Sequence, residues 1–175
     1  MRKIFNTLVA SILLIACLFM VGCSTIPKDY KDAKKNLISA DYDVYVSESL
    51  VETISIFVDF ASDALLYYED DFYISEYDAI VSELIKDYSK YYEKGIFATK
   101  CESSYDLGYY YEEDLVLLYF DDRESAEGFY NEVEPYLDDF AMCEFEAGVP
   151  EDWSYGREGK IVYIGSEGAL EDVKG

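Results

Sequence analysis

Carboxylates are the most numerous side chains in this sequence that could do chemistry. There are 37 Asp and Glu residues against 14 Lys and Arg, which gives a formal net charge of −23. Several acids lie next to one another, and carboxylate oxygens are the ligands that calcium prefers. These groups are Asp41 and Asp43, Glu69–Asp71, Glu112–Asp114, Asp121 and Asp122, and Asp138 and Asp139. None has the spacing of a calcium-binding EF-hand loop. Solvated surface is therefore the favoured interpretation, and a weak calcium site is the alternative.

The sequence contains no histidine. This excludes the most common general base, the most common zinc and copper ligand, and every catalytic pair in which histidine activates a serine or a cysteine. No other catalytic motif is recognisable. We therefore expect a protein that is not an enzyme and that carries no cofactor.

The 19 tyrosines and the single tryptophan suggest a different function. Their rings combine an apolar face with a polar tip, and on exposed loops they can stack on sugars or contact a protein. The helical and strand spacing places Tyr88, Tyr119 and Tyr130 in the core. Two further groups are predicted in loops and form a candidate binding surface: Tyr109, Tyr110 and Tyr111, with Trp153 and Tyr155.

The first 24 residues have the composition of a secretory signal. Arg2 and Lys3 precede an almost wholly apolar segment, residues 4–22, which ends at Cys23. A membrane-spanning helix needs about 20 apolar residues, so this segment could instead stay as a transmembrane helix. The abrupt change to polar residues after Cys23 favours cleavage.

The segment Met20-Val21-Gly22-Cys23 resembles the lipobox of bacterial lipoproteins. In that family the cysteine receives a diacylglycerol and the chain is cut just before it. The resemblance implies a signal peptide over residues 1–22, lipid on Cys23 and a place on the outer face of the cell membrane. Met20 stands where the family most often has leucine. Cys17 ends a second fair match, but cutting there would leave apolar residues 18–21 on the mature chain. The general build is similar to that of small lipoproteins of Gram-positive bacteria to which no activity is assigned.

Two cysteines, Cys101 and Cys143, lie beyond the predicted anchor. A disulfide between them would close a loop of about 43 residues and add roughly 4 kcal/mol of stability. Two buried free thiols are the alternative. Near the anchor, Lys28, Lys31 and Lys35 gather on one strip if a helix starts early. They could lie on anionic lipid or form an ordinary solvated face.

The apolar periodicity predicts one domain over residues 30–175, behind a lipidated tether over residues 23–29. Helices are predicted over 30–39, 50–68, 77–91 (ended by Gly95) and 126–137 (capped by Asp122 and loosened by Pro135), with a closing helix through Val173. Within the second of these, residues 53–58 could equally form a strand by propensity. Strands are predicted over 41–47, 96–102, 114–120 and 160–164, with an edge strand over 140–146 and a loop over 149–158. The run Asp114–Phe120 is apolar on both faces, which is typical of a central strand.

This order predicts an α+β fold of the ferredoxin-like, split βαβ kind. It would have an antiparallel sheet with helices on one face, an added N-terminal helix and a helical insertion. We expect a lipid-anchored, non-enzymatic interaction domain whose partner is a protein or a cell-wall glycan. A low-affinity calcium-binding or structural surface protein is the alternative. The negative charge excludes nucleic acid as a partner.

Overall fold

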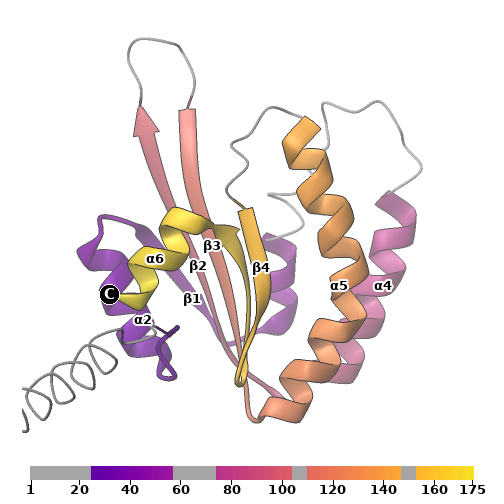
Figure 1. Cartoon of the computed structure of the whole chain (residues 1–175). Helices are drawn as coiled ribbons and strands as arrows, with labels where there is room; N and C mark the ends of the chain where they lie inside the picture. Colours follow the sequence, from indigo (N-terminus) through magenta and orange to yellow (C-terminus); the bar gives the residue numbers. More distant parts are fainter. Residues whose placement is uncertain (1–24, 57–73, 104–109, 147–152) are drawn as a thin grey trace, which may run out of the picture.

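The computed structural model describes residues 25–56, 74–103, 110–146 and 153–175. Its centre is a five-stranded antiparallel sheet in the order β1-β2-β3-β5-β4 (Figure 1). The strands are β1 (Asp43–Ser47), β2 (Tyr92–Ser103), β3 (Tyr110–Phe120), β4 (Trp153–Glu158) and β5 (Ile161–Ser166). The predicted α+β class and the antiparallel sheet are confirmed.

Helices cover both faces of this sheet. Helices α2 (Tyr30–Ser39) and α6 (Glu167–Lys174) lie on one face, and α4 (Ile74–Tyr88), α5 (Arg123–Glu146) and a helical segment over 50–56 lie on the other (Figure 1). The prediction of helices on one face only is therefore wrong. The reason lies in β3, where every residue from Asp114 to Phe120 is buried. Successive strand residues point to opposite faces, so both faces of β3 require a covering layer.

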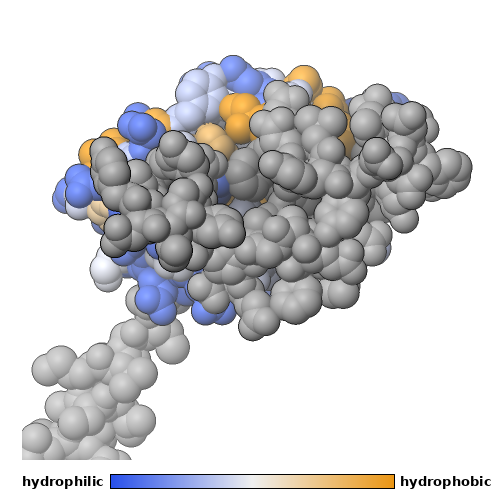
Figure 2. Space-filling model, turned by 90° about the horizontal axis from the view of Figure 1, so that it is seen from above, coloured by the Kyte–Doolittle hydropathy of each residue, from blue (hydrophilic) through white to orange (hydrophobic). Residues whose placement is uncertain are grey.

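The core accordingly consists of two clusters separated by the sheet. The first joins Leu115, Leu117 and Tyr119 of β3 to α2 and α6, and the second joins Val116, Leu118 and Phe120 to α5. The predicted central position of this strand is confirmed. Along the rim visible from above, hydrophilic and hydrophobic residues of the described surface are interspersed (Figure 2).

The strand order does not confirm the ferredoxin-like arrangement. A split βαβ unit places two parallel strands on either side of a third, with a helix connecting them. Here β1 pairs directly with β2, and the two strands are antiparallel although helices separate them in sequence. None of the described strand pairs is parallel.

Several predicted elements have different limits in the structure. The predicted loop over 149–158 is wrong for its second half, because β4 pairs with β5 through a two-residue turn in which Gly159 has a φ of 61°. The predicted edge strand over 140–146 is also wrong, because α5 continues through Pro135 to Glu146. Leu137 lies in the same core cluster as Phe129, so packing on the sheet holds the helix on both sides of the proline.

Gly95 does not end a helix. Helix α4 ends at Tyr88, and Gly95 lies within β2 opposite Leu118 of β3. A Cβ atom at Gly95 would lie 2.5 Å from the Thr53 Oγ1 atom. The absence of a side chain therefore allows the helical segment over 50–56 to approach the sheet closely.

Candidate functional site: the N-terminal segment and helix α2

The N-terminal segment is docked on the domain from Ile26 onward. Ile26 is 2% exposed and belongs to the core cluster shared by α2, α6 and the sheet. Its backbone N–H donates to the Glu158 carboxylate at 3.2 Å, and the Tyr119 hydroxyl donates to the Pro27 carbonyl at 3.0 Å. Part of the segment predicted as a tether is thus integrated into the fold.

The Tyr119 hydroxyl is well suited to hold this segment. Its side chain is 1% exposed, and burial raises the pKa of the hydroxyl well above its ordinary value, with the carboxylates of Asp29 and Asp32 adding to the effect. The hydroxyl therefore keeps its proton and remains a donor to the Pro27 carbonyl throughout the neutral range.

Helix α2 follows directly and has a fixed orientation. Asp29 is its N-cap, with the side chain accepting from the Lys31 backbone N–H at 2.9 Å. Ala33 and Leu37 are fully buried against the sheet. The Asn36 side chain donates to the Val173 carbonyl of α6 at 2.8 Å. These contacts hold α2 against α6 and the sheet, and they determine which side of the helix faces outward.

The outward side of α2 carries three lysines, Lys31, Lys34 and Lys35, which we call the basic face of α2. At about 100° per residue, these lysines and Ile38 lie within an arc of about 100° on the side away from Ala33 and Leu37. None of the three ammonium groups forms an ion pair within the described part of the chain. The predicted strip included Lys31 and Lys35 but missed Lys34, although its spacing of three from Lys31 was a usable signal.

Acidic residues near α2 lie on a different side. By the same helical geometry, Asp32 lies toward Asn36, and therefore toward α6. On α6, Glu167 and Glu171 line an open hollow of about 230 Å³ together with Glu158. The other lining residues are Ile26, Ser154, Tyr163, Leu170 and Lys174. Carboxylates therefore gather on the α6 side of this layer, whereas the basic face of α2 contains none.

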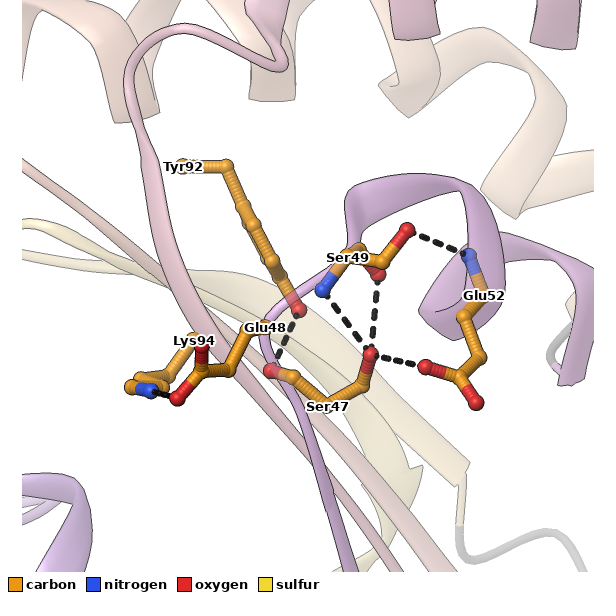
Figure 3. Close-up of polar contacts among 6 residues, drawn as sticks. All are labelled: Ser47, Glu48, Ser49, Glu52, Tyr92 and Lys94. Atoms are coloured by element: carbon orange, nitrogen blue, oxygen red, sulfur yellow. Dashed lines mark hydrogen bonds and ion pairs between the residues drawn. The ribbon is translucent and has the colours of Figure 1, made fainter.

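A second polar cluster lies on the far side of the sheet, where β1 leads into the helical segment over 50–56 (Figure 3). The Ser47 Oγ atom accepts from the Ser49 backbone N–H at 2.9 Å and lies 2.7 Å from the Glu52 carboxylate. The Glu52 backbone N–H donates to the Ser49 Oγ atom at 3.3 Å. Ser49-x-x-Glu52 is thus a helix-capping sequence, which the apolar periodicity alone does not reveal.

This cluster stabilises the connection between β1, the helical segment over 50–56 and β2. Ser47 is 4% exposed, so its hydroxyl is shielded from any reactant. The Tyr92 hydroxyl lies 2.7 Å from the Thr53 hydroxyl and 3.4 Å from the Ser47 carbonyl, which connects β2 to the same turn. Hydrogen bonds from Tyr45 and Ser47 lower the pKa of the Glu52 carboxyl, which keeps it charged as their common acceptor.

The structure changes the placement of the candidate aromatic surface. Trp153 and Tyr155 are not in a loop but on β4, where both are half-buried against the second core cluster. Tyr110 and Tyr111 are in β3 rather than in a loop. Their side chains, and the whole of Tyr109, lie outside what the structure describes. The rings predicted in the core are confirmed there: Tyr119 is buried, and Tyr88 and Tyr130 pack against the second cluster.

Cys101 belongs to β2 and Cys143 to α5, and their side chains lie outside the described part of the structure. Cys23, the predicted lipid site, also lies outside the described residues.

Two residues of the predicted acidic groups, Asp122 and Asp114, occupy separate positions in the fold. Asp122 caps α5 by accepting from the Ser125 backbone N–H at 2.8 Å, and this bond lowers the pKa of its carboxyl. Asp114 is 1% exposed within β3. The group Glu69–Asp71 lies outside the described residues. Within the residues that the structure describes, no group of three or more His, Cys, Asp or Glu side chains is arranged to hold a metal ion.

Comparisons with protein-family models, with curated proteins and with solved structures found no match to this chain. In the described ranges, no helix has the length and apolar character needed to cross a membrane.

Proposed function

We propose that this protein is a lipid-anchored interaction domain on the outer face of the cell membrane, bound through Cys23. The observation that carries this proposal is the lipobox-like segment Met20-Val21-Gly22-Cys23. The docking of Ile26 adds that the folded domain begins three residues after Cys23. Three residues span at most about 11 Å. A diacylglycerol on Cys23 would therefore hold the domain directly against the bilayer, at the side where α2 begins.

The anchor is tested by labelling cells that express the full chain with a fatty-acid analogue. We expect label on the wild-type protein and on a Cys17→Ala variant, and none on a Cys23→Ala variant, which should accumulate as uncleaved precursor. Label on Cys23→Ala that is lost in Cys17→Ala would move the anchor to Cys17. Absence of label from all three proteins would contradict the proposal.

For the interaction itself, the side of the sheet formed by β1 has the most suitable exposed residues. Among the described strands, β1 pairs only with β2, and no described strand occupies its other edge, where a partner could add a strand. Tyr45 is 44% exposed, and Val51, next to the Glu52 that binds the Tyr45 hydroxyl, is 47% exposed. An exposed aromatic and an apolar residue beside a strand edge favour a protein partner over a glycan.

A photo-cross-linking amino acid at position 45 tests this surface on intact cells. The control is the same amino acid at Tyr91, which is 37% exposed and lies between α4 and β2. A discrete adduct from position 45 and none from position 91 supports a protein partner on β1. Adducts from neither position, together with a thermal shift caused by peptidoglycan fragments, would favour a glycan partner. Tyr109–Tyr111 would then be the candidate binding residues.

A further inference from the structure

We propose that the basic face of α2 lies on the anionic headgroups of the membrane that carries the anchor. The inference rests on the proposed lipid anchor and specifies how the anchored domain is oriented. It draws on three features: the three residues of chain that separate Cys23 from the buried Ile26, the lysines of α2, which form no ion pair within the described residues, and the separation of opposite charges between α2 and α6.

The short reach keeps α2 close to the bilayer. Ile26 is buried in the cluster that also contains Ala33 and Leu37 of α2, and Asp29 caps the same helix. The segment between the anchor and the helix therefore cannot extend freely, because the contacts of Ile26 and Pro27 hold it on the domain. Any orientation of the anchored domain places the start of α2 near the headgroups.

The basic face of α2 is complementary to an anionic surface, with the exposed carboxylates of Asp29 and Asp32 beside it at the start of the helix. Lys31 and Lys35 are exposed, Lys34 is half-buried, and Lys28 is exposed just before the helix. The whole chain has a formal net charge of −23, so most of its surface would be repelled by the same headgroups. Each lysine close to such a surface strengthens its binding by about fivefold. Orientations with the basic face of α2 toward the bilayer are therefore strongly favoured.

Residues next to the basic face of α2 favour one orientation of the domain on the membrane. Glu167 and Glu171 lie on α6, and repulsion would turn that side of the layer away from the membrane. Ile38 lies in the same arc as the lysines and is 52% exposed. An apolar side chain among lysines on an outward helix face is typical of helices that lie in the membrane interface.

The test is lysine footprinting of the full chain in vesicles of phosphatidylcholine, with and without phosphatidylglycerol. An acetylating reagent modifies exposed ammonium groups, and mass spectrometry gives the rate at each lysine. With phosphatidylglycerol, we expect acetylation of Lys28, Lys31 and Lys35 to slow by about fivefold or more, and high salt to restore it. Lys86 and Lys90, exposed in and after α4, should change less than twofold. Equal rates at Lys31 and Lys35 in both vesicle types would overturn the proposal.

A matched pair of variants identifies the source of any protection. Lys31→Glu/Lys35→Glu should abolish the protection of Lys28, whereas Lys86→Glu/Lys90→Glu should leave it unchanged. Protection of Lys28 that survives the first variant would overturn the role of the basic face. Intact mass measured on the same samples reports the lipid on Cys23 independently. A chain without lipid that still shows protected lysines would contradict the anchor and not the orientation, because an uncleaved apolar segment would tether the same end.

Discussion

Replacement of Ile26 with alanine should destabilise the whole domain, although this residue is only three positions from the proposed anchor. The Ile26 side chain is 2% exposed. Three carbon atoms are removed, and each buried methylene contributes about 0.8 kcal/mol, so the lost transfer free energy is about 2.4 kcal/mol. A residual cavity adds to this cost. However, the segment can also detach and leave the remaining core intact, which limits the total to about 2–3 kcal/mol.

The assay is equilibrium and thermal unfolding of the full chain in detergent micelles. For a domain of this size, the expected loss corresponds to a decrease of about 5–10 °C in Tm. The matched control is Ile38→Ala on α2, whose side chain is 52% exposed. It should change the free energy of unfolding by less than about 0.5 kcal/mol. If Ile26→Ala behaved like this control, the docking of the N-terminal segment, and the short reach that follows from it, would be refuted.

Three further predictions concern the fold that supports the basic face of α2. Ser166 caps α6, with its side chain accepting from the Ala169 backbone N–H at 3.2 Å, so Ser166→Ala should cost about 1 kcal/mol in chemical denaturation; an unchanged midpoint would contradict the cap. At Gly165 a Cβ atom would lie 2.4 Å from the Asp114 carbonyl oxygen, so Gly165→Ala should cost about 1–3 kcal/mol, and a variant as stable as the wild type would contradict the close packing of β3 and β5. Burial raises the pKa of Tyr92 from 10.0 to about 12. The stability that the protonated Tyr92 hydroxyl contributes is therefore complete below pH 10 and is lost as the pH rises through 12. The loss amounts to about 2 kcal/mol at pH 12. Tyr92→Phe should reduce the alkaline loss of stability in unfolding curves measured from pH 9 to pH 12, and an identical loss in both proteins would contradict this assignment.

Features that depend on a single short stretch were predictable from the sequence. The helix over 30–39 and the central strand over 114–120 both follow from local apolar patterns, and both are present. Strand β4 was missed because its sequence, Trp153 to Glu158, contains glycine and two charged residues. Its extended conformation depends on pairing with β5, and this pairing is not visible in the local pattern. Helices were predicted for both layers, but all of them were placed on one face of the sheet, although the two apolar faces of β3 required a layer on each side.

The same distinction between local features and long-range contacts applies to the candidate site. The concentration of lysines next to Cys23 could be identified from the sequence alone. The docking that orients them could not, because Ile26 contacts Glu158, 132 positions later, and Pro27 contacts Tyr119, 92 positions later. Contacts over such separations are decided by the whole fold. The segment over 24–29 therefore has the composition of a flexible tether, but from Ile26 onward it is packed on the domain.

The most direct test of the proposed anchor is the mass of the N-terminal peptide of the protein purified from the membranes of the cells that produce it. We expect a peptide that begins at Cys23 and carries the mass of a diacylglycerol on its thiol. A peptide that begins at Met1, or one that begins at Cys23 or Ser24 without lipid, would contradict the proposed anchor.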